Sequence, residues 1–323
     1  MMDRPVFWKT TLSASPPSLL LAAREIAAHQ DYPQGALYMV ATPIGNLADI
    51  GLRALHVLSL ADTVACEDTR HTAGLMQSYG LHKPLLAVHE HNEAQAAQTV
   101  VQRLREGQRV AYVSDAGTPG VSDPGARLAQ AVKEAGHRCI PLPGASSITA
   151  LLSVTGHSGW NGQFVFQGFL PPKATERLKA VQALGGDARA SVLLEAPHRI
   201  EALAKDLATL GARTLTVGRE LTKQFEQVAQ MPASDFPAWL QADEHRTRGE
   251  FVLMVHPMAA EADSDALPTE SLRVLDLLMA EMPVKSAVRL CAEITGQPRN
   301  ALYPAALARK ALAQDADDES DEA

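Results

Sequence analysis

The chain has 323 residues, of which 46% are hydrophobic and 20% charged, as is typical of a globular protein with ample material for a core. Its three scattered cysteines exclude a disulfide framework and a cysteine zinc site, and they fit the reducing cytoplasm. The net charge of −8 disfavours a surface that binds nucleic acid through lysine and arginine, but residues 315–323 alone hold six acidic residues. The remaining chain is therefore close to neutral.

The first 34 residues are expected to be weakly ordered, because the alternation of strand-like and helix-like patterns begins only near Leu37. No window reaches the roughly 18 uninterrupted apolar residues of a membrane-spanning helix, and Arg24 and Glu25 soon follow the early run SLLLAA. We therefore predict neither a membrane anchor nor a signal peptide.

Residues 35–153 alternate short apolar runs with amphipathic stretches. The strand-like runs lie at 37–44, 63–68, 85–91, 109–115 and 138–144, and helix-like patterns separate them. Short strands that alternate with longer helices predict βαβ units and a largely parallel sheet. These residues are expected to form an α/β domain.

Residues 154–258 form a second series with more strands and fewer helices. The strand-like runs lie at 163–171, 191–197, 214–220 and 249–257, whereas 221–242 is less regular. This composition predicts a second α/β domain with a mixed sheet and helices gathered on one side. The glycine-rich, polar stretch 153–162 marks the boundary between the two domains.

The C-terminal part of the chain begins with residues 259–268, which are small and acidic and are predicted to form a linker. Residues 269–313 contain three helical patterns, separated near Met282 and at Gly296. They are compatible with a helix-turn-helix, and a plain helical docking module is an equally good interpretation. Residues 314–323 are predicted to be an acidic, disordered tail.

Loops rich in glycine, proline, aspartate or serine follow the predicted strands of the first domain. They read TPIGNLAD, EDTRHT, HEHNE, SDAGTPGVSDPG and PGASS. Because ligands bind outside the carboxyl ends of the strands in open α/β sheets, five such loops on one rim predict a binding site. None of them matches GxGxxG or GxxxxGK[ST], which argues against the phosphates of NAD or ATP.

The HEHNE loop contains residue types that bind metals, but no third and fourth ligand is evident, so no metal site is predicted. Asn92 is instead expected to cap the following helix. Charged residues of the second domain also stand at strand ends, where they either form surface ion pairs or face the same cleft as the first-domain loops. This set comprises Lys173, Glu195, His198, Arg199, Arg219, Glu220, Lys223 and Glu250.

Nine sequence blocks within residues 37–255 agree in order and spacing with one known family. They are LYMVATPIGNLADIGLRALHVL, ACEDTRHT, HEHNE, VSDAGTPGVSDPG, LPGASS, GFLPPK, EAPHR, RELTK and GEFVL. In these blocks the chain resembles the family of small-subunit ribosomal RNA methyltransferase I, which belongs to the tetrapyrrole methylase superfamily. Residues 287–307 resemble the helix-turn-helix appendage of that family. The resemblance implies a two-domain, tetrapyrrole-methylase-like α/β fold with a small C-terminal helix-turn-helix domain.

The resemblance also implies an enzyme that holds S-adenosylmethionine between its α/β domains. Such an enzyme methylates the 2′-hydroxyl of a cytidine in the decoding region of 16S rRNA, usually as a homodimer. Glycine-rich turns let backbone groups approach this cofactor closely, and carboxylates accept from its hydroxyl or ammonium groups. The expected cofactor contacts are Pro43, Asp115, Ala116, Gly117, Ser146, Ser147, Ala196 and Leu221. Asp123 is expected to cap the next helix, with Pro124 at the first helical position.

Methyl transfer to a hydroxyl is assisted by a general base. The candidate bases are Glu67, Asp68, His91, Glu90 and Lys223, and we place Glu90 and Lys223 first, although a lysine must be made neutral for this role. The groups expected to position RNA are Arg70, His91, Lys173, Arg199 and Arg219. A nucleotide inside folded RNA must be splayed out of its stack, and the near-neutral chain predicts an assembled or partly assembled small ribosomal subunit as the substrate.

Two other functions stay open on the sequence alone. A precorrin-type tetrapyrrole methylase would share the cofactor cleft but would need a cavity for a large macrocycle. A noncatalytic ribosome-assembly factor would bind the subunit through the helix-turn-helix and keep the cleft only as structure. The EDTRHT, HEHNE and EAPHR blocks favour RNA over a macrocycle, and the intact cofactor loops argue against a noncatalytic protein.

Overall fold

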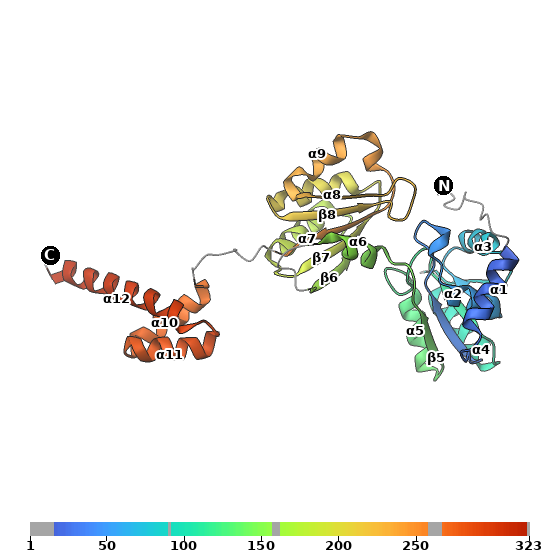
Figure 1. Cartoon of the computed structure of the whole chain (residues 1–323), viewed down its shortest axis with the longest axis horizontal. Helices are drawn as coiled ribbons and strands as arrows, with labels where there is room; N and C mark the ends of the chain where they lie inside the picture. Colours follow the sequence, from blue (N-terminus) through green and yellow to red (C-terminus); the bar gives the residue numbers. More distant parts are fainter. Residues whose placement is uncertain (1–15, 90–91, 157–161, 258–266, 322–323) are drawn as a thin grey trace. The chain divides into compact units, whose positions relative to one another are not determined.

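The computed structural model describes residues 16–89, 92–156, 162–257 and 267–321. The chain forms two compact units, Met1–Met258 and Ala259–Ala323 (Figure 1). Within the described residues, no helix is long and apolar enough to cross a bilayer.

The first sheet of the large unit is parallel throughout, as predicted. Its strands are arranged in the order β3-β2-β4-β1-β5. They are β1 (Ala36–Val40), β2 (Thr63–Cys66), β3 (Leu85–Ala87), β4 (Val110–Val113) and β5 (Arg138–Leu142). Three of the five strands, β1, β2 and β4, are short buried runs, which explains why apolar patterning located them.

Helices cover both faces of this first sheet. On one face, α1 (Pro16–Ala27), α2 (Leu52–Leu60) and α3 (Thr69–Ser78) pack on side chains such as Tyr38 and Val40. On the other face, α4 (Glu93–Arg105) and α5 (Gly125–Glu134) pack on their sequence neighbours, among them Leu37. Successive side chains of a strand point to opposite faces, so each strand contributes to both cores.

Helix α1 was not predicted from the sequence, and the expected weak order of residues 1–34 is wrong for residues 16–34. Ala23 is fully buried, and Leu19 and Leu20 pack on the core beside α2. Residues at this spacing lie on one side of a helix, and their burial against α2 stabilises a segment that composition alone does not identify. Residues 1–15 lie outside the described part of the chain.

The second sheet is mixed, as predicted. Its strands are arranged in the order β6-β7-β10-β8-β9, with β6 parallel to β7 and the other neighbours antiparallel. They are β6 (Phe164–Gly168), β7 (Ala190–Glu195), β8 (Thr214–Arg219), β9 (Gln227–Pro232) and β10 (Phe251–Val255). The edge strand β9 lies in the stretch that appears irregular in sequence, because it is half-exposed and carries polar residues.

Helices on the second sheet gather on one face, also as predicted. There α7 (Ala174–Gly186), α8 (Ile200–Leu207) and α9 (Phe236–Gln241) cover a core that includes Leu193 and Leu253. The other face packs on α6 (Ser147–Thr155). Short 3-10 turns complete the unit: η1 (Leu47–Asp49), η2 (Ala208–Leu210), η3 (Ala233–Asp235) and η4 (Glu244–Thr247).

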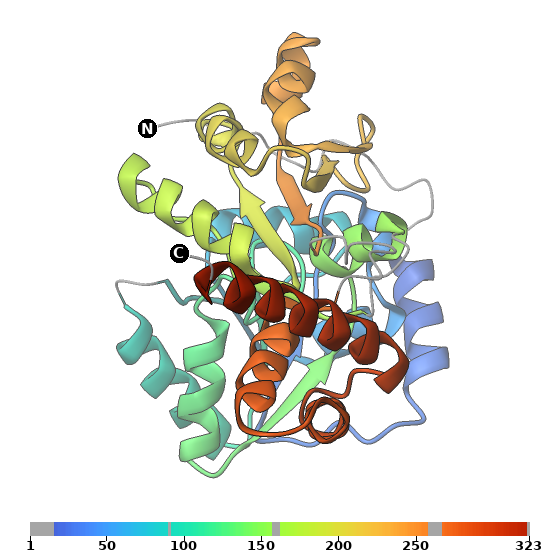
Figure 2. The ribbon, with the colours of Figure 1, turned by 90° about the vertical axis from the view of Figure 1, so that its left-hand side faces the viewer.

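The C-terminal unit consists, in its described part, of α10 (Thr269–Glu281), α11 (Val284–Thr295) and α12 (Arg299–Asp321). They enclose a small core around Leu275, Cys291 and Leu302. Gly296, in the left-handed conformation, ends α11. Helix α12 continues to Asp321 (Figure 2), so it includes most of residues 314–323, which were predicted to be disordered. Extending an existing helix is easier than starting one, and this favours continuation beyond the packed turns.

We expect Leu151→Ala to lower the free energy of unfolding by about 2–5 kcal/mol. Leu151 is fully buried between α6 and the second sheet, so the variant leaves a cavity there. Urea unfolding measures the change. Val154→Ala in the same helix is the control, because Val154 is exposed and its truncation removes little buried surface. Equal loss in both variants would contradict the assignment of α6 to this core.

Candidate active site

The loop after β4 is joined to the loop after β1 by a pair of backbone hydrogen bonds. Thr42 and Gly117 each donate to the carbonyl of the other over 3.0 Å. Gly117 has φ of +80°, and a Cβ there would lie 3.3 Å from Ile44 Cγ2. The turn therefore requires glycine both for its conformation and for the close approach of the two loops.

Asp123 organises the second half of the same loop. Its carboxylate accepts hydrogen bonds from the backbone N–H groups of Gly120 (2.8 Å), Val121 (3.2 Å) and Gly125 (2.7 Å). The expected role at the start of α5 is confirmed, since Gly125 is the first helical residue. Pro124 occupies the N-cap position of α5, whereas the sequence predicts it at the first helical position.

Acidic residues gather at the carboxyl ends of β2 and β4. Asp115 Oδ1 accepts from the backbone N–H of Asp68 over 3.2 Å. Burial raises the pKa of Tyr112, and the charges of Asp123, Glu67 and Asp115 raise it further. Four carboxylates from two sequence motifs thus gather at the carboxyl ends of β2 and β4: those of Glu67, Asp68, Asp115 and Asp123.

Asp68 is the N-cap of α3. Its Oδ1 accepts from the N–H groups of Arg70 (2.8 Å) and His71 (3.4 Å). Burial alone would raise the pKa of Asp68, but these hydrogen bonds outweigh it and hold the pKa below its usual value. A carboxylate stabilised in its ionised form is a weak proton acceptor, so Asp68 is a poor candidate for a general base.

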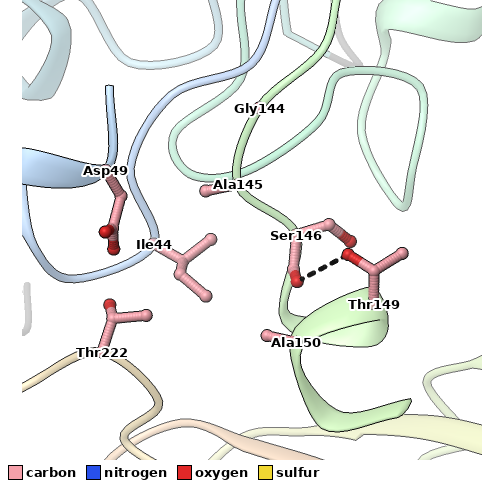
Figure 3. A pocket seen from close by; sticks show the side chains of 8 residues that line it. All are labelled: Ile44, Asp49, Gly144, Ala145, Ser146, Thr149, Ala150 and Thr222. Atoms are coloured by element: carbon pink, nitrogen blue, oxygen red, sulfur yellow. Dashed lines mark hydrogen bonds between the residues drawn. The ribbon is translucent and has the colours of Figure 1, made fainter. Parts of the chain in front are cut away.

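A cavity of about 370 Å³ opens beside these loops. Figure 3 shows Asp49 and Ile44 on one side with Thr222, and Ser146, Thr149 and Ala150 on the other. The Thr149 hydroxyl donates to the Ser146 carbonyl over 3.3 Å. The full lining is Ile44, Asp49, Gly144, Ala145, Ser146, Thr149, Ala150 and Thr222. The walls therefore combine small apolar surfaces with hydroxyl and carboxylate oxygens.

The loop after β8 brings the second domain to this cavity. Glu220 and Thr222 both have positive φ, +52° and +68°, which is a strained conformation for residues other than glycine. Lys223 Nζ lies 2.7 Å from Glu220 Oε1 and 3.2 Å from Glu250 Oε2. The ion pairs hold the strained loop in place.

Lys223 is poorly suited to the role of general base in this arrangement. Its amino group is committed to the carboxylates of Glu220 and Glu250, which hold it within the loop. A Cβ on Gly45 would lie 2.4 Å from Lys223 Cγ and 2.9 Å from Thr222 Oγ1. Lys223 thus packs directly against the loop after β1 and holds the two loops together.

The structure brings part of the predicted cofactor set together. Ser146 lines the cavity, and Gly117 touches two residues that line it, Ile44 and Ala145. Leu221 lies in the apolar cluster behind Thr222. The remaining predicted residues do not line the cavity: Pro43, Asp115, Ala116, Ser147 and Ala196.

Sequence reasoning missed the other residues that line the cavity. Ile44 and Thr222 are direct neighbours of predicted residues, and Thr149 and Ala150 lie about one helical turn after Ser146. The spacing of a helix that starts at Ser147 was available as a signal for the last two.

Two of the predicted RNA-binding residues, Arg219 and Arg199, use their guanidinium groups for contacts within the protein. Arg219 is buried, and its guanidinium donates to the carbonyls of Arg248 (2.7 Å) and His245 (2.6 Å). It fixes two loops and is not accessible to RNA, so this prediction is wrong. Arg199 lies 3.1 Å from the carboxylate of Glu195 and donates to a backbone carbonyl.

The other predicted RNA-binding residues either are exposed or lie outside the described chain. The side chains of Arg70 and Lys173 are 87% and 77% exposed, and each forms a surface ion pair, Arg70 with Asp68 (3.3 Å) and Lys173 with Glu176 (3.2 Å). Glu90 and His91 lie outside the described residues.

Asn92 does occupy the N-cap of α4, but its side chain bonds to His89 and Ala87 rather than to the helix, so the predicted capping hydrogen bond is wrong.

Two family models match the chain. The model described as Tetrapyrrole (Corrin/Porphyrin) Methylases covers residues 36–237, and the RsmI C-terminal HTH domain covers residues 265–310. A relative from Escherichia coli O157:H7, Ribosomal RNA small subunit methyltransferase I, is 45% identical over 86% of this chain and 96% of its own length. The relative of the same name from Neisseria meningitidis serogroup B is 47% identical over 85% and 94%.

The chain belongs to the ribosomal RNA small subunit methyltransferase I family. Membership confirms the resemblance seen in the nine motifs, and the second family model decides between the two interpretations of residues 269–313 in favour of the helix-turn-helix. The structure is also similar in fold to the methyltransferase CobJ, with a TM-score of 0.53 and 17% identity. That similarity covers 71% of this chain and 97% of CobJ.

We expect Gly45→Ala to lower the free energy of unfolding by about 1–3 kcal/mol, because the added methyl group overlaps Lys223 Cγ. Urea unfolding measures the change. Gly74→Ala is the matched control, since a Cβ there meets no atom within 4 Å and α3 gains a better helix former. A Gly45 variant as stable as the control would show that the two loops do not pack as described.

Proposed function

We propose that the protein transfers a methyl group from S-adenosylmethionine to the ribose 2′-hydroxyl of a cytidine in the decoding region of 16S rRNA. The chain is a methyltransferase by family. The observation that supports the ribosomal substrate most strongly is the identity of 45–47% to relatives named for small-subunit rRNA, along nearly their full length. We further propose that it acts in the cytoplasm as a homodimer.

The cavity beside the first-domain loops fits S-adenosylmethionine in size and chemistry. Its volume of about 370 Å³ lies in the range of small-molecule sites. Asp49 and the hydroxyls of Ser146 and Thr222 offer partners for ammonium and hydroxyl groups, while Ile44 and Ala150 offer apolar contact. The bound cofactor supplies an activated methyl group on a sulfonium. The carboxylates gathered at the rim favour a ligand with this positive charge.

The acceptor hydroxyl must lose its proton as its oxygen attacks the methyl carbon. With Lys223 held between two carboxylates and Asp68 stabilised as an anion, we assign the proton acceptor to one of the remaining loop carboxylates, Glu67 or Glu90. Lys223 then serves to hold Thr222 against the loop after β1.

The proposed substrate is the assembled or partly assembled small subunit. In the C-terminal unit, residues 267–310 carry six basic and four acidic residues, so this segment is slightly positive while the whole chain has a net charge of −8. A chain with a net negative charge gains little from nonspecific contact with naked RNA, and shape recognition of the folded subunit has to supply the rest.

The deciding experiment supplies radiolabelled S-adenosylmethionine and small subunits from a strain that lacks this gene. We expect label on the 2′-oxygen of one cytidine of 16S rRNA, and none on subunits from the parent strain, which are already methylated. Label on a base atom would contradict the 2′-O assignment. Subunit binding without any methyl transfer would support a noncatalytic assembly factor. Methyl transfer to a tetrapyrrole would support the hypothesis of a precorrin-type methylase.

Asp115→Ala is expected to weaken S-adenosylmethionine binding by up to about 10- to 150-fold, although Asp115 lies outside the cavity lining, because its carboxylate holds the neighbouring loop through a charged hydrogen bond worth about 1.5–3 kcal/mol. The change also releases the N–H of Asp68 and loosens the EDTRHT loop. Isothermal titration calorimetry measures the affinity. The control is Asp62→Ala, because Asp62 also accepts a backbone N–H, from Arg109, but lies at the amino end of β2. Unchanged affinity in the Asp115 variant would remove this residue from the cofactor site.

A further inference from the structure

The loop between β6 and α7 combines an exposed aromatic residue with an exposed cation. This loop, residues 169–173, reads FLPPK. Phe169 is 50% exposed, whereas its neighbour Leu170 is buried in the core under α7 and α8. Lys173 at the other end has a side chain that is 77% exposed. The loop thus carries an exposed aromatic ring at its start and an exposed cation four residues later.

A first ion pair fixes the beginning of this loop. The Arg199 guanidinium donates to the carbonyl of Leu170. Its Nε lies 3.1 Å from Glu195 Oε1, and the Glu195 side chain is completely buried at the end of β7. Because a buried carboxylate cannot move away without exposing its charge to apolar surroundings, Arg199 is held in one position.

A second ion pair fixes the end of the loop. Arg177 Nη1 donates to the carbonyl of Pro172 over 3.3 Å, and Arg177 Nε donates to Asp206 over 2.6 Å. The two prolines of the loop, Pro171 and Pro172, further restrict its backbone. Two arginines therefore hold two carbonyls of a five-residue loop, and each arginine is held in turn by a carboxylate. This arrangement presents Phe169 and Lys173 with little conformational freedom.

The loop begins at the rim of the candidate active site. Gly168, the last residue of β6, has φ of +69°, and a Cβ there would lie 3.6 Å from Ser122 Oγ. Ser122 belongs to the loop after β4, whose other half contacts the cavity wall through Gly117. Ser122 also has a positive φ, of +62°, so two constrained backbone segments lie near each other here. Phe169 follows Gly168 directly in the chain.

We propose that Phe169 stacks on the base of a nucleotide splayed out of the rRNA, while Lys173 contacts an adjacent phosphate. Glu195, Arg199, Arg177 and Asp206 are positioning residues that fix the loop. The chemistry of the pair supports this occupant, since single-stranded bases stack on aromatic side chains and lysine binds the backbone phosphate beside them. The inference rests on the proposed function, because it names groups that would hold its acceptor RNA.

The test compares Phe169→Ala with Phe164→Ala. Phe164 begins the same strand, is 41% exposed and lies at the opposite end of β6 from the loop, so it is a matched control. We expect kcat/KM for the small subunit to fall about 5- to 150-fold in Phe169→Ala and to stay unchanged in Phe164→Ala. Affinity for S-adenosylmethionine, measured by calorimetry, stays unchanged in both. Phe169→Tyr retains activity, whereas Phe169→Leu loses it as the alanine variant does.

Three results would overturn the stacking role. They are equal activity of the Phe169 and Phe164 alanine variants, full activity of Phe169→Leu, and weakened cofactor binding in Phe169→Ala. Filter binding of the subunit at several salt concentrations tests the lysine: Lys173→Ala is expected to reduce the slope of log K against log salt by about one. An unchanged slope would overturn the phosphate contact.

Failure of the proposed function is distinguishable from failure of this inference. If the wild-type protein binds cofactor but methylates no RNA, the proposed function fails. In that case filter binding of the small subunit, measured for Phe169→Ala and for the wild type, still tests the stacking: equal affinities would overturn it. If the wild type methylates and Phe169→Ala matches it, only the inference fails.

Discussion

One apolar cluster brings the loops of the two sheets together. Leu151 of α6, Leu221 of the loop after β8 and Val252 of β10 form its centre, and Ile44 and Val121 from first-domain loops pack on it. The cavity lies directly beside this cluster, because Ile44 belongs to both and Leu221 precedes Thr222. Removing apolar surface from water is worth roughly 25 cal/mol per Å², and here that gain fixes where the polar groups of two sheets meet.

The same cluster explains how the loops tolerate an unfavourable backbone. Ser122, Glu220 and Thr222 have positive φ, each at a cost of about 1–3 kcal/mol. The three backbone hydrogen bonds accepted by Asp123 offset the strain beside Ser122. Burial of Leu221 and the Lys223 ion pairs offset that of the β8–β9 loop. Among the described residues, positive φ outside glycine is thus found in the two loops that approach the candidate site, while the strands that carry them are regular.

Sequence reasoning succeeded where a short-range pattern determines the structure. Buried strands appear as apolar runs, and of the residues predicted at the carboxyl ends of the strands, Ser146 lines the cavity and Gly117 lies next to residues that line it. It failed where long-range contacts decide. Nothing local distinguishes Arg219, whose guanidinium binds carbonyls of a distant loop, from an exposed arginine such as Arg70. One of the two partners of Lys223 likewise lies 27 residues away, at Glu250.

In the proposed reaction, the two reactants are held by different sheets. The cofactor cavity is built mainly from first-domain loops, whereas the constrained loop that carries Phe169 belongs to the second sheet. Alignment of two reactants is worth on the order of 7–11 kcal/mol in favourable cases, and a misplacement of about 1 Å can cost about 10²-fold in rate. A single general base contributes less, typically about 10²–10⁴-fold. The site and its surroundings contain an apolar cluster, tight glycine contacts and arginines paired with carboxylates that fix loop positions. The structure is therefore suited to a mechanism in which the rigidity of the domain junction, more than the basicity of one side chain, lowers the barrier.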